Sequence, residues 1–440
     1  MAETGFAPVP EANRFVLANA TLPAALVEAP GLVVTGDSLA RADIIVSDGI
    51  IESVTAPGAS VATPRVDLDG GMAWPCFVDM HTHLDKGHIW GRKPNPNGTF
   101  QGALDAAQAD REANWSAEDV RRRMDFALRS AYAHGTALIR THIDSIAPQH
   151  AISWPVFNEV RADWAGRIDL QAVTIFAVDA VLDDNFLAAM ASTVRKYRGI
   201  FGAVTYMVPE LDRALDRVFR LARDSGFDLD FHVDESEDPA ARSLRHIAAA
   251  ATRHAFKGRI NVGHCCSLAL QPRKEAEETL ARLHETGISV VSLPMCNMYL
   301  QNRHAGRTPR WRGVTLLHEM CARGIPVAVA SDNTRDPFYA YGDLDMMEVF
   351  REATRIMHFD HPVGDWPRLV AADAAKIIGR PDVGMIVPGR PADLVLFRAR
   401  SWTELLARPQ ADRTVLRKGK AIDRTLPDYR ELDDLMGKAS

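Results

Sequence analysis

Residues 80–85 are Met80-His81-Thr82-His83-Leu84-Asp85, a stretch that places two histidines one residue apart at the end of an apolar run. In a β-strand, residues i and i+2 point to the same face, so His81 and His83 are expected to project side by side. Neutral imidazole is a common ligand of divalent transition metals, and two imidazoles on one face provide half of a metal site. The H-x-H pattern alone is a weak signal, so its meaning depends on whether other strands supply further ligands.

Around this stretch, from residue 74 to residue 378, short apolar runs alternate with amphipathic segments. Besides the strand that leads to His81, the candidate strands are 137–139, 170–176, 202–207, 229–233, 260–262, 288–293 and 327–330. Helical periodicity fills the gaps, for example at 119–132, 211–222 and 276–284. Strands that alternate with helices in this way predict a (β/α)₈ barrel of the TIM type, whose active sites lie at the carboxyl ends of the strands.

Both ends of the chain have a different, β-rich pattern. Residues 14–70 contain short apolar runs such as 31–34 and 43–46, separated by turns with Gly and Asp. Similar runs return at 384–389, 392–397 and 415–420. We therefore expect an α/β protein in which residues 1–73 and 379–440 form a small β-sandwich and residues 74–378 form the catalytic barrel. Residues 90–101, rich in Pro and Gly, are expected to form a long loop after the first barrel strand.

The composition excludes several classes of protein. The net charge of −6, without a basic stripe, argues against nucleic-acid binding. The sequence has no apolar run of 18 residues and no signal-peptide pattern after Met1, so we expect a cytoplasmic protein that does not bind a membrane. Its 5 scattered cysteines fit reduced thiols, and neither C-x-x-C nor the cysteine-based deaminase signature is present. A homo-oligomer is left open.

Later candidate strands end in residues that can bind a metal. The run 229–232 ends in His232, and Glu235 follows where the loop begins. The run 260–264 ends in His264, and the run 327–332 ends in Asp332. Nitrogen ligands combined with one carboxylate suit a single divalent ion that keeps an open position for water. Such an ion can lower the pKa of water from about 16 to about 7.

Further segments strengthen this pattern: Arg140-Thr141-His142-Ile143-Asp144, His232-Val233-Asp234-Glu235, residues 297–303, and Ser331-Asp332-Asn333 with Asp336-Pro337-Phe338. Together with the H-x-H stretch they resemble the amidohydrolase superfamily, in the subtype with one metal, and in particular the bacterial cytosine deaminases and their relatives. The similarity runs from about residue 66 to about residue 420. It is specific for the family and much less specific for the substrate.

The resemblance implies a role for each strand-end residue. His81, His83 and His232 would bind one divalent ion, zinc or iron, and Asp332 would complete the site. His264 would hydrogen-bond the water, and Asp332 would pass a water proton to departing ammonia. Glu235 would move a proton onto a ring nitrogen while water attacks the carbon that bears the amine. No lysine stands at the end of the run 203–207, where two-metal relatives bridge their ions, so one metal is favoured.

The segments expected to recognise the substrate differ from those of cytosine deaminases. Phe176-Ala177-Val178 replaces a Phe-Pro-Gln run whose amide contacts the pyrimidine edge, and Phe338 replaces an expected tryptophan. Because polar pocket groups enforce specificity strongly, cytosine itself is not the expected substrate. We predict a metal-dependent hydrolytic deaminase of another amino-substituted N-heterocycle, such as isoguanine, a pterin or a triazine-like ring. The candidates to line its pocket are Tyr206, Met207, Glu210, Asn297, Asn333 and Phe338.

Other interpretations of the same residues remain. The same metal site could hydrolyse a ring carbon–nitrogen bond in a cyclic amide. A barrel that only binds a ligand is disfavoured by the intact ligand set and Glu235. Cys296 could act as a nucleophile, but the sequence offers no paired base. Arg140 and His142 are expected to make internal hydrogen bonds instead of contacting the substrate.

Overall fold

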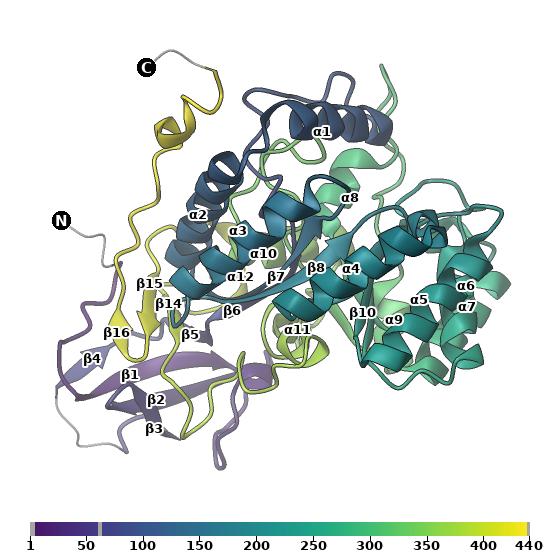
Figure 1. Ribbon diagram of the computed structural model, residues 1–440. Coiled ribbons are helices and arrows are strands. Elements are labelled where there is room, and N and C mark those ends of the chain that lie inside the picture. The colour runs from purple at the N-terminus through teal and green to yellow at the C-terminus, as the bar shows by residue number, and fades with distance from the viewer. Residues whose placement is uncertain (1–4, 60–63, 438–440) are drawn as a thin grey trace.

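The computed structural model describes residues 5–59 and 64–437, and its middle part alternates strands with helices as predicted (Figure 1). The strands of this part are β6 (Phe77–Thr82), β7 (Thr136–Asp144), β8 (Asp169–Ile175), β9 (Phe201–Thr205), β10 (Leu229–Val233), β11 (Ile260–His264), β12 (Ser289–Ser292) and β13 (Val327–Val329). Each overlaps one of the apolar runs expected from the sequence. The prediction of an α/β protein is confirmed.

These strands pair in parallel in two sheets, with the orders β6-β7-β8 and β13-β12-β11-β10-β9. Isolated parallel bridges connect the two sheets at both edges. Thr82 pairs with Asp332 beyond β13, and Ala177 beyond β8 pairs with Val204 of β9. The carboxyl ends of the strands therefore point the same way, which brings residues from distant parts of the sequence to one edge.

Helices lie between and around these strands. They are α1 (Phe100–Asn114), α2 (Ala117–His134), α3 (His150–Asp163), α4 (Asp184–Tyr197), α5 (Leu211–Ser225), α6 (Ser243–Arg253), α7 (Arg273–Thr286), α8 (Pro294–Leu300), α9 (Leu317–Ala322), α10 (Met346–Met357), α11 (Ala372–Ile377) and α12 (Trp402–Ala407). Short 3₁₀ turns lie at η1 (Ala24–Leu26), η2 (Val178–Leu182), η3 (Cys266–Leu270), η4 (Trp366–Val370) and η5 (Tyr429–Leu432). Among the described residues, no helix combines the length and the apolar composition needed to cross a bilayer.

Local sequence explains where these helices begin and end. The Ser116 side chain caps α2 by accepting a hydrogen bond from the Asp119 amide, and Gly135 ends it in the left-handed conformation at φ 98°. Helix α5 buries an apolar stripe at spacings of three and four residues, which packs against the sheet. The predicted helices at 119–132, 211–222 and 276–284 fall within α2, α5 and α7.

Strands from both ends of the chain share one further sheet, seen at one end of the molecule in Figure 1. Its members are β1 (Arg14–Pro23), β2 (Leu39–Ser47), β3 (Ile50–Thr55), β4 (Arg65–Asp67), β5 (Met72–Pro75), β14 (Leu394–Phe397), β15 (Thr414–Arg417) and β16 (Lys420–Ala421). The order is β16-β15-β14-β5-β1-β2-β3, with β4 paired to β1. The two ends meet where β14 pairs antiparallel with β5.

Two of the terminal runs predicted as strands do not form strands. Residues 31–34 contribute only an isolated bridge between Val34 and Ala40, and residues 384–389 only one between Ile386 and Val27. Val33 is 81% exposed, so the first of these runs has no apolar face to bury against a neighbour. The terminal strands form a single hydrogen-bonded sheet in the described part of the chain, and a β-sandwich is not shown.

The junction between the terminal sheet and the rest of the chain is apolar and closely packed. Trp74 of β5 is completely buried, and its ring contacts Phe350 of α10, Phe397 of β14 and Trp402 of α12 edge-on at centroid distances of 5.5, 6.3 and 6.1 Å. Beside this cluster, the buried Arg413 donates to both oxygens of Asp345 at 2.7 and 2.6 Å.

Candidate active site

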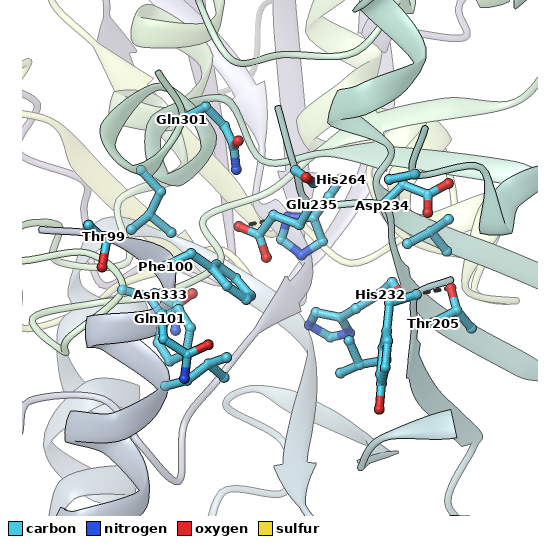
Figure 2. A pocket seen from close by; sticks show the side chains of 18 of the residues that line it. Thr99, Phe100, Gln101, Thr205, His232, Asp234, Glu235, His264, Gln301 and Asn333 are labelled. Atoms are coloured by element: carbon cyan, nitrogen blue, oxygen red, sulfur yellow. Dashed lines mark hydrogen bonds and ion pairs between the residues drawn. The ribbon is translucent and has the colours of Figure 1, made fainter. Parts of the chain in front are cut away.

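A cavity of 1080 Å³ opens at the carboxyl ends of the strands (Figure 2). Residues at or just beyond the ends of β6, β7, β9, β10, β11 and β13 line it, among them His83, Asp144, Thr205, His232, His264 and Asp332. In Figure 2, Phe100, Gln101 and Asn333 lie on one side of the hollow and His232 on the other. This is the edge at which the sequence predicted the chemistry.

The structure brings His81, His83, His232 and Asp332 together, each buried and each offering one ligand atom within 4.8 Å of the others. The Nε2 atom of His232 lies 3.1 Å from Nε2 of His81 and 3.2 Å from Nε2 of His83. Asp332 Oδ1 lies 3.2 Å from His83 Nε2 and 3.6 Å from His81 Nε2.

The state of these side chains fits a metal ion. Neither carboxylate oxygen of Asp332 has a hydrogen-bond partner among the described residues, although both are buried. Buried polar atoms are nearly always satisfied, so an unpaired carboxylate facing three converging nitrogens fits a bound cation. Burial also lowers the pKa of His81, His83 and His232 well below the usual value for histidine, which keeps the imidazoles neutral and able to bind a metal.

Backbone contacts between β6 and the segment after β13 hold this set in place. The Asp332 amide donates to the carbonyl of His81 at 2.9 Å, and the Thr82 hydroxyl donates to the carbonyl of Asp332 at 2.7 Å. Asp332 has a positive φ of 63°, a conformation that non-glycine residues adopt uncommonly. The local backbone therefore turns the carboxylate toward His81 and His83.

Glu235, His264 and Asn297 form a second polar group beside the four ligands. The Asn297 amide nitrogen lies 3.0 Å from His264 Nδ1 and 3.2 Å from Glu235 Oε1. Because an amide NH₂ group can only donate, Nδ1 accepts and the ring proton of His264 is on Nε2. That Nε2 has no hydrogen-bond partner among the described residues, so it remains a donor available to the site.

Glu235 differs from the acidic residue next to it. Asp234 accepts hydrogen bonds from the amides of Ser243 and Leu244, both at 3.0 Å, and from the Ser243 hydroxyl at 2.7 Å, so it holds the start of α6. Glu235 instead faces the cavity (Figure 2). Burial, and next the charge of Asp332, raise the pKa of Glu235 well above its usual value, which favours the protonated form of this acid.

Most of the residues expected to contact the substrate line the cavity, but Asn297 does not. Tyr206, Met207, Asn333 and Phe338 line the cavity, and Tyr206 and Met207 are 39% and 46% exposed at its rim. Asn297 is buried and does not line the cavity, because its amide is taken up by Glu235 and His264.

Glu210 also lies outside the cavity lining. It is exposed and pairs with Arg213 at 2.8 Å, so the expectation that it lines the pocket is wrong.

Arg140 and His142 of β7 were expected to form internal hydrogen bonds. Arg140 donates to Asp230 at 2.8 Å and to Gln171 at 2.9 Å, as expected of a residue that bonds internally. The His142 ring lies 4.0 Å from that of His81, but neither of its nitrogens has a hydrogen-bond partner among the described residues. The expected hydrogen bond of His142 is therefore not present.

Cys296 does not have the features of a nucleophile. Its sulfur is buried and lies 3.8 Å from the carbonyl oxygens of Ser331 and Asn333. Burial raises the pKa of its thiol well above the usual value, so the thiolate is disfavoured.

Lys86, which directly follows the stretch 80–85, is a cavity residue that no sequence pattern indicated. Its side chain is 8% exposed and lines the cavity, where Nζ lies 3.8 Å from Asp144 Oδ1 and 5.0 Å from the centre of the Phe338 ring. A cation three residues after the second histidine was the available signal, but only the fold shows that it turns inward.

Comparison with known proteins agrees with this geometry. Residues 127–423 match the family described as "Amidohydrolase family". The chain belongs to this amidohydrolase family. It is 58% identical over 436 residues to the pterin deaminase of Rhizobium rhizogenes (strain K84 / ATCC BAA-868), and the alignment covers 98% of this chain and 99% of the relative. A more distant relative, the N-isopropylammelide isopropyl amidohydrolase of Pseudomonas sp. (strain ADP), is 24% identical over 81% of this chain and 87% of its own length.

A solved structure has the same fold as this amidohydrolase. The 5-methylcytosine deaminase of Klebsiella pneumoniae with bound 5-fluorocytosine matches with a TM-score of 0.80 and 25% identity, over 93% of this chain and 97% of the other. The predicted membership of the amidohydrolase superfamily is thus confirmed, and so is the predicted class, a hydrolytic deaminase of an amino-substituted N-heterocycle.

Proposed function

We propose that this amidohydrolase is a metal-dependent deaminase whose substrate is a pterin, the 2-amino-4-oxopteridine ring. Hydrolysis at C2 would replace the amine by oxygen and release ammonia. The substrate is suggested by the pterin deaminase that is 58% identical over nearly the whole chain. Among the heterocycles predicted from the sequence, a pterin is also compatible with the loss of the pyrimidine-reading Phe-Pro-Gln run.

One observation carries the reaction class: three buried imidazoles and an unpaired buried carboxylate meet in one cavity beside Glu235, whose pKa is raised by burial. His81, His83, His232 and Asp332 would hold one divalent ion, zinc or iron. The ion, when bound, supplies Lewis acidity that lowers the pKa of water toward neutrality. A site with neutral histidines and one carboxylate is of the kind that leaves a position open for that water.

The side chains of this chain then account for the movement of protons. Asp332 has an oxygen without a protein donor and would take a proton from the attacking water. Glu235 would give its proton to the ring nitrogen next to C2 as the carbon–oxygen bond forms. The Nε2–H of His264 would donate to the attacking oxygen and hold it in line with C2.

Collapse of the tetrahedral carbon completes the reaction. Asp332 would pass its proton to the amine, which leaves as ammonia, and Glu235 would recover the proton from the ring nitrogen. Asp332 and Glu235 therefore return to their starting protonation states. The net reaction consumes one water and releases one ammonia. Asn297 would keep Glu235 and His264 correctly oriented through its two amide contacts.

The finer architecture is also part of the proposal. The bridges at both edges of the two parallel sheets support a closed (β/α)₈ barrel. Residues 1–73 and 379–440 would form the accessory domain and residues 74–378 the catalytic domain, with β5 extending across the first boundary. The cytoplasmic location, the lack of nucleic-acid or membrane partners and the oligomeric state stay predictions.

An ammonia-release screen with metal-replete protein tests the proposal. Pterin, isoguanine, cytosine and an aminotriazine are compared by kcat/KM, and the products are identified by mass spectrometry. We expect pterin to be preferred and its product to be 2,4-dioxopteridine. Preference for cytosine would overturn the substrate assignment. A ring-opened product without free ammonia would overturn the deaminase and favour the cyclic amide hydrolase.

A further inference from the structure

Lys86 is a buried cation whose hydrogen-bonding capacity is unused within the described chain. Its side chain is 8% exposed and lines the cavity. The nearest carboxylate oxygen, Asp144 Oδ1, lies 3.8 Å from Nζ, which is within ion-pair range but beyond a hydrogen bond. An ammonium group has three donors, and buried charges are normally both paired and hydrogen-bonded. The donors of Lys86 are therefore available to a molecule in the cavity.

The neighbours of Lys86 fix where the ammonium lies. The Arg111 guanidinium donates to the other oxygen of Asp144 at 2.9 Å, so this carboxylate is held between two cations. On another side the ammonium lies 5.0 Å from the centre of the Phe338 ring, which packs edge-on against Phe100 at 5.7 Å. These contacts place the cation on the wall formed by the loops after β6, β7 and β13.

Lys86 and Glu235 reach the cavity from different sheets. Lys86 follows β6 in the three-stranded sheet, whereas Glu235 follows β10 in the five-stranded sheet, and both line the cavity. The charge of Lys86 still acts on Glu235 and Asp332, because it lowers the pKa of each against the raising effect of burial. The ammonium is thus close enough to interact with the reacting groups but lies on another wall.

Resting on the proposed deaminase function, we propose that Lys86 is a specificity-determining residue that donates a hydrogen bond to a ring carbonyl oxygen of the substrate. A flat ring with its amine-bearing carbon at the metal ligands and one ring nitrogen at Glu235 would present another edge to Lys86. In a 2-amino-4-oxo heterocycle that edge carries the C4 oxygen. Lys86 would therefore select rings with this oxygen over amino-substituted rings that lack it.

The surroundings favour a neutral carbonyl as the acceptor. Four carboxyl groups, those of Asp85, Asp144, Asp332 and Asp336, are already buried near Lys86. A further full negative charge among them would be repelled, whereas a carbonyl carries only a partial one. A hydrogen bond from the ammonium to the C4 oxygen would also withdraw electron density from the ring and make C2 more open to attack by water, so it affects turnover as well as binding.

A comparison of two substrates in two variants tests this role. Pterin and 2-aminopteridine, which lacks the C4 oxygen, are assayed with wild type, Lys86→Met and the control Lys93→Met. Lys93 lies on the same loop but does not line the cavity. We expect Lys86→Met to lower kcat/KM for pterin by about 10- to 100-fold, the range for a lost charged hydrogen bond. The loss for 2-aminopteridine should be about 10-fold smaller than the loss for pterin, because only the effect of the Lys86 charge on Glu235 and Asp332 remains; metal content should be unchanged, and Lys93→Met should alter neither value.

Each other outcome counts against a defined part of the proposal. An equal loss for both substrates would show that Lys86 acts only on structure or on the ligands, and would overturn the specificity role. If Lys86→Met does not fold, Lys86→Arg replaces it: Arg keeps the charge and donors, so a loss of the preference for pterin in this variant would also count against the role. If 2-aminopteridine binds without turnover, inhibition constants are compared in the same way. A wild-type protein that releases no ammonia from pterin would overturn the proposed function, and the role of Lys86 with it.

Discussion

Asp332 at the cavity and Asp345 at the junction with the terminal sheet are both buried carboxylates, but their surroundings differ. Asp345 accepts hydrogen bonds from Arg413 at 2.7 and 2.6 Å and from the Met347 amide at 2.9 Å, where it caps α10. Burial alone would raise its pKa, yet the charge of Arg413 brings the pKa below the usual value. Asp332 accepts no hydrogen bond from an N–H or O–H group of the described residues, and burial raises its pKa.

The difference separates a carboxylate that stabilises the fold from one that is held ready for a ligand. A buried polar group without a partner destabilises the folded chain, so its presence needs a compensating role. At Asp345 the partner is part of the chain, and the pair joins α10 to the segment before β15. At Asp332 three histidines converge on the unpaired oxygens, and the partner is expected to come from outside the chain.

Replacing Asp332, the carboxylate without a hydrogen-bond partner, should have the largest effect on activity. Asp332→Asn is expected to lower kcat on the order of 10⁴-fold, because it removes both a metal ligand and a proton acceptor. Metal content, measured by mass spectrometry, should fall with it, as it should in His232→Ala. Without metal, the melting temperature of Asp332→Asn should be at least that of wild type, because the substitution removes a buried charge that has no partner. A variant that keeps metal and turnover would contradict the contrast with Asp345.

Glu235 offers a sharper test inside the cavity, because its proposed role is to move a proton without binding the metal. Glu235→Gln is expected to keep the metal content of wild type while kcat falls by about 10²- to 10⁴-fold. The neighbouring Asp234→Asn should instead lower stability by about 1 kcal/mol through the weakened start of α6. Turnover within a few-fold of wild type in Glu235→Gln would show that another group transfers the proton.

Disrupting the ion pair between Arg413 and Asp345 should lower the stability of the fold without changing turnover. Arg413→Met leaves Asp345 buried without its cation and is expected to reduce the free energy of unfolding by about 3–5 kcal/mol. Turnover per folded molecule should match wild type, since Arg413 does not line the cavity.

The pair also has a defined pH dependence. Because the folded pKa of Asp345 is lowered, the stabilisation is fully present above the unfolded carboxyl pKa of about 4, begins to be lost as the pH falls below it, and is gone only below the lowered folded pKa. Urea unfolding of wild type between pH 7 and pH 3 should show the first part of this loss, and Arg413→Met should not show that component. An Arg413→Met protein as stable as wild type would contradict a structural role for the pair.

The regular parts of the fold could be predicted from sequence because they depend on local patterns. Every barrel-type strand and the helices α2, α5 and α7 fall on apolar periodicity that is visible in the chain. The run 31–34 has the same apolar character but no surface to cover it, which a local pattern cannot show.

The site could be predicted to the extent that it lies at strand ends. His81, His83, His232 and Asp332 meet because parallel strands end at one edge. The inward turn of Lys86 depends on Asp144 and Phe338, which come from other loops, and Asn297 is withdrawn from the cavity by its contacts with Glu235 and His264. Such tertiary contacts leave no spacing signature, so these placements required the structure.

The pairing of β5 with β14 has a consequence for how the protein is made. On a ribosome that adds about 5–20 residues per second, β5 emerges roughly 15–60 s before β14 is complete. During that interval Trp74 lacks Phe350, Phe397 and Trp402, the rings that later enclose it. The nascent amino-terminal strands thus present an unpaired edge, and an indole without three of its aromatic partners, throughout translation of the residues between β5 and β14.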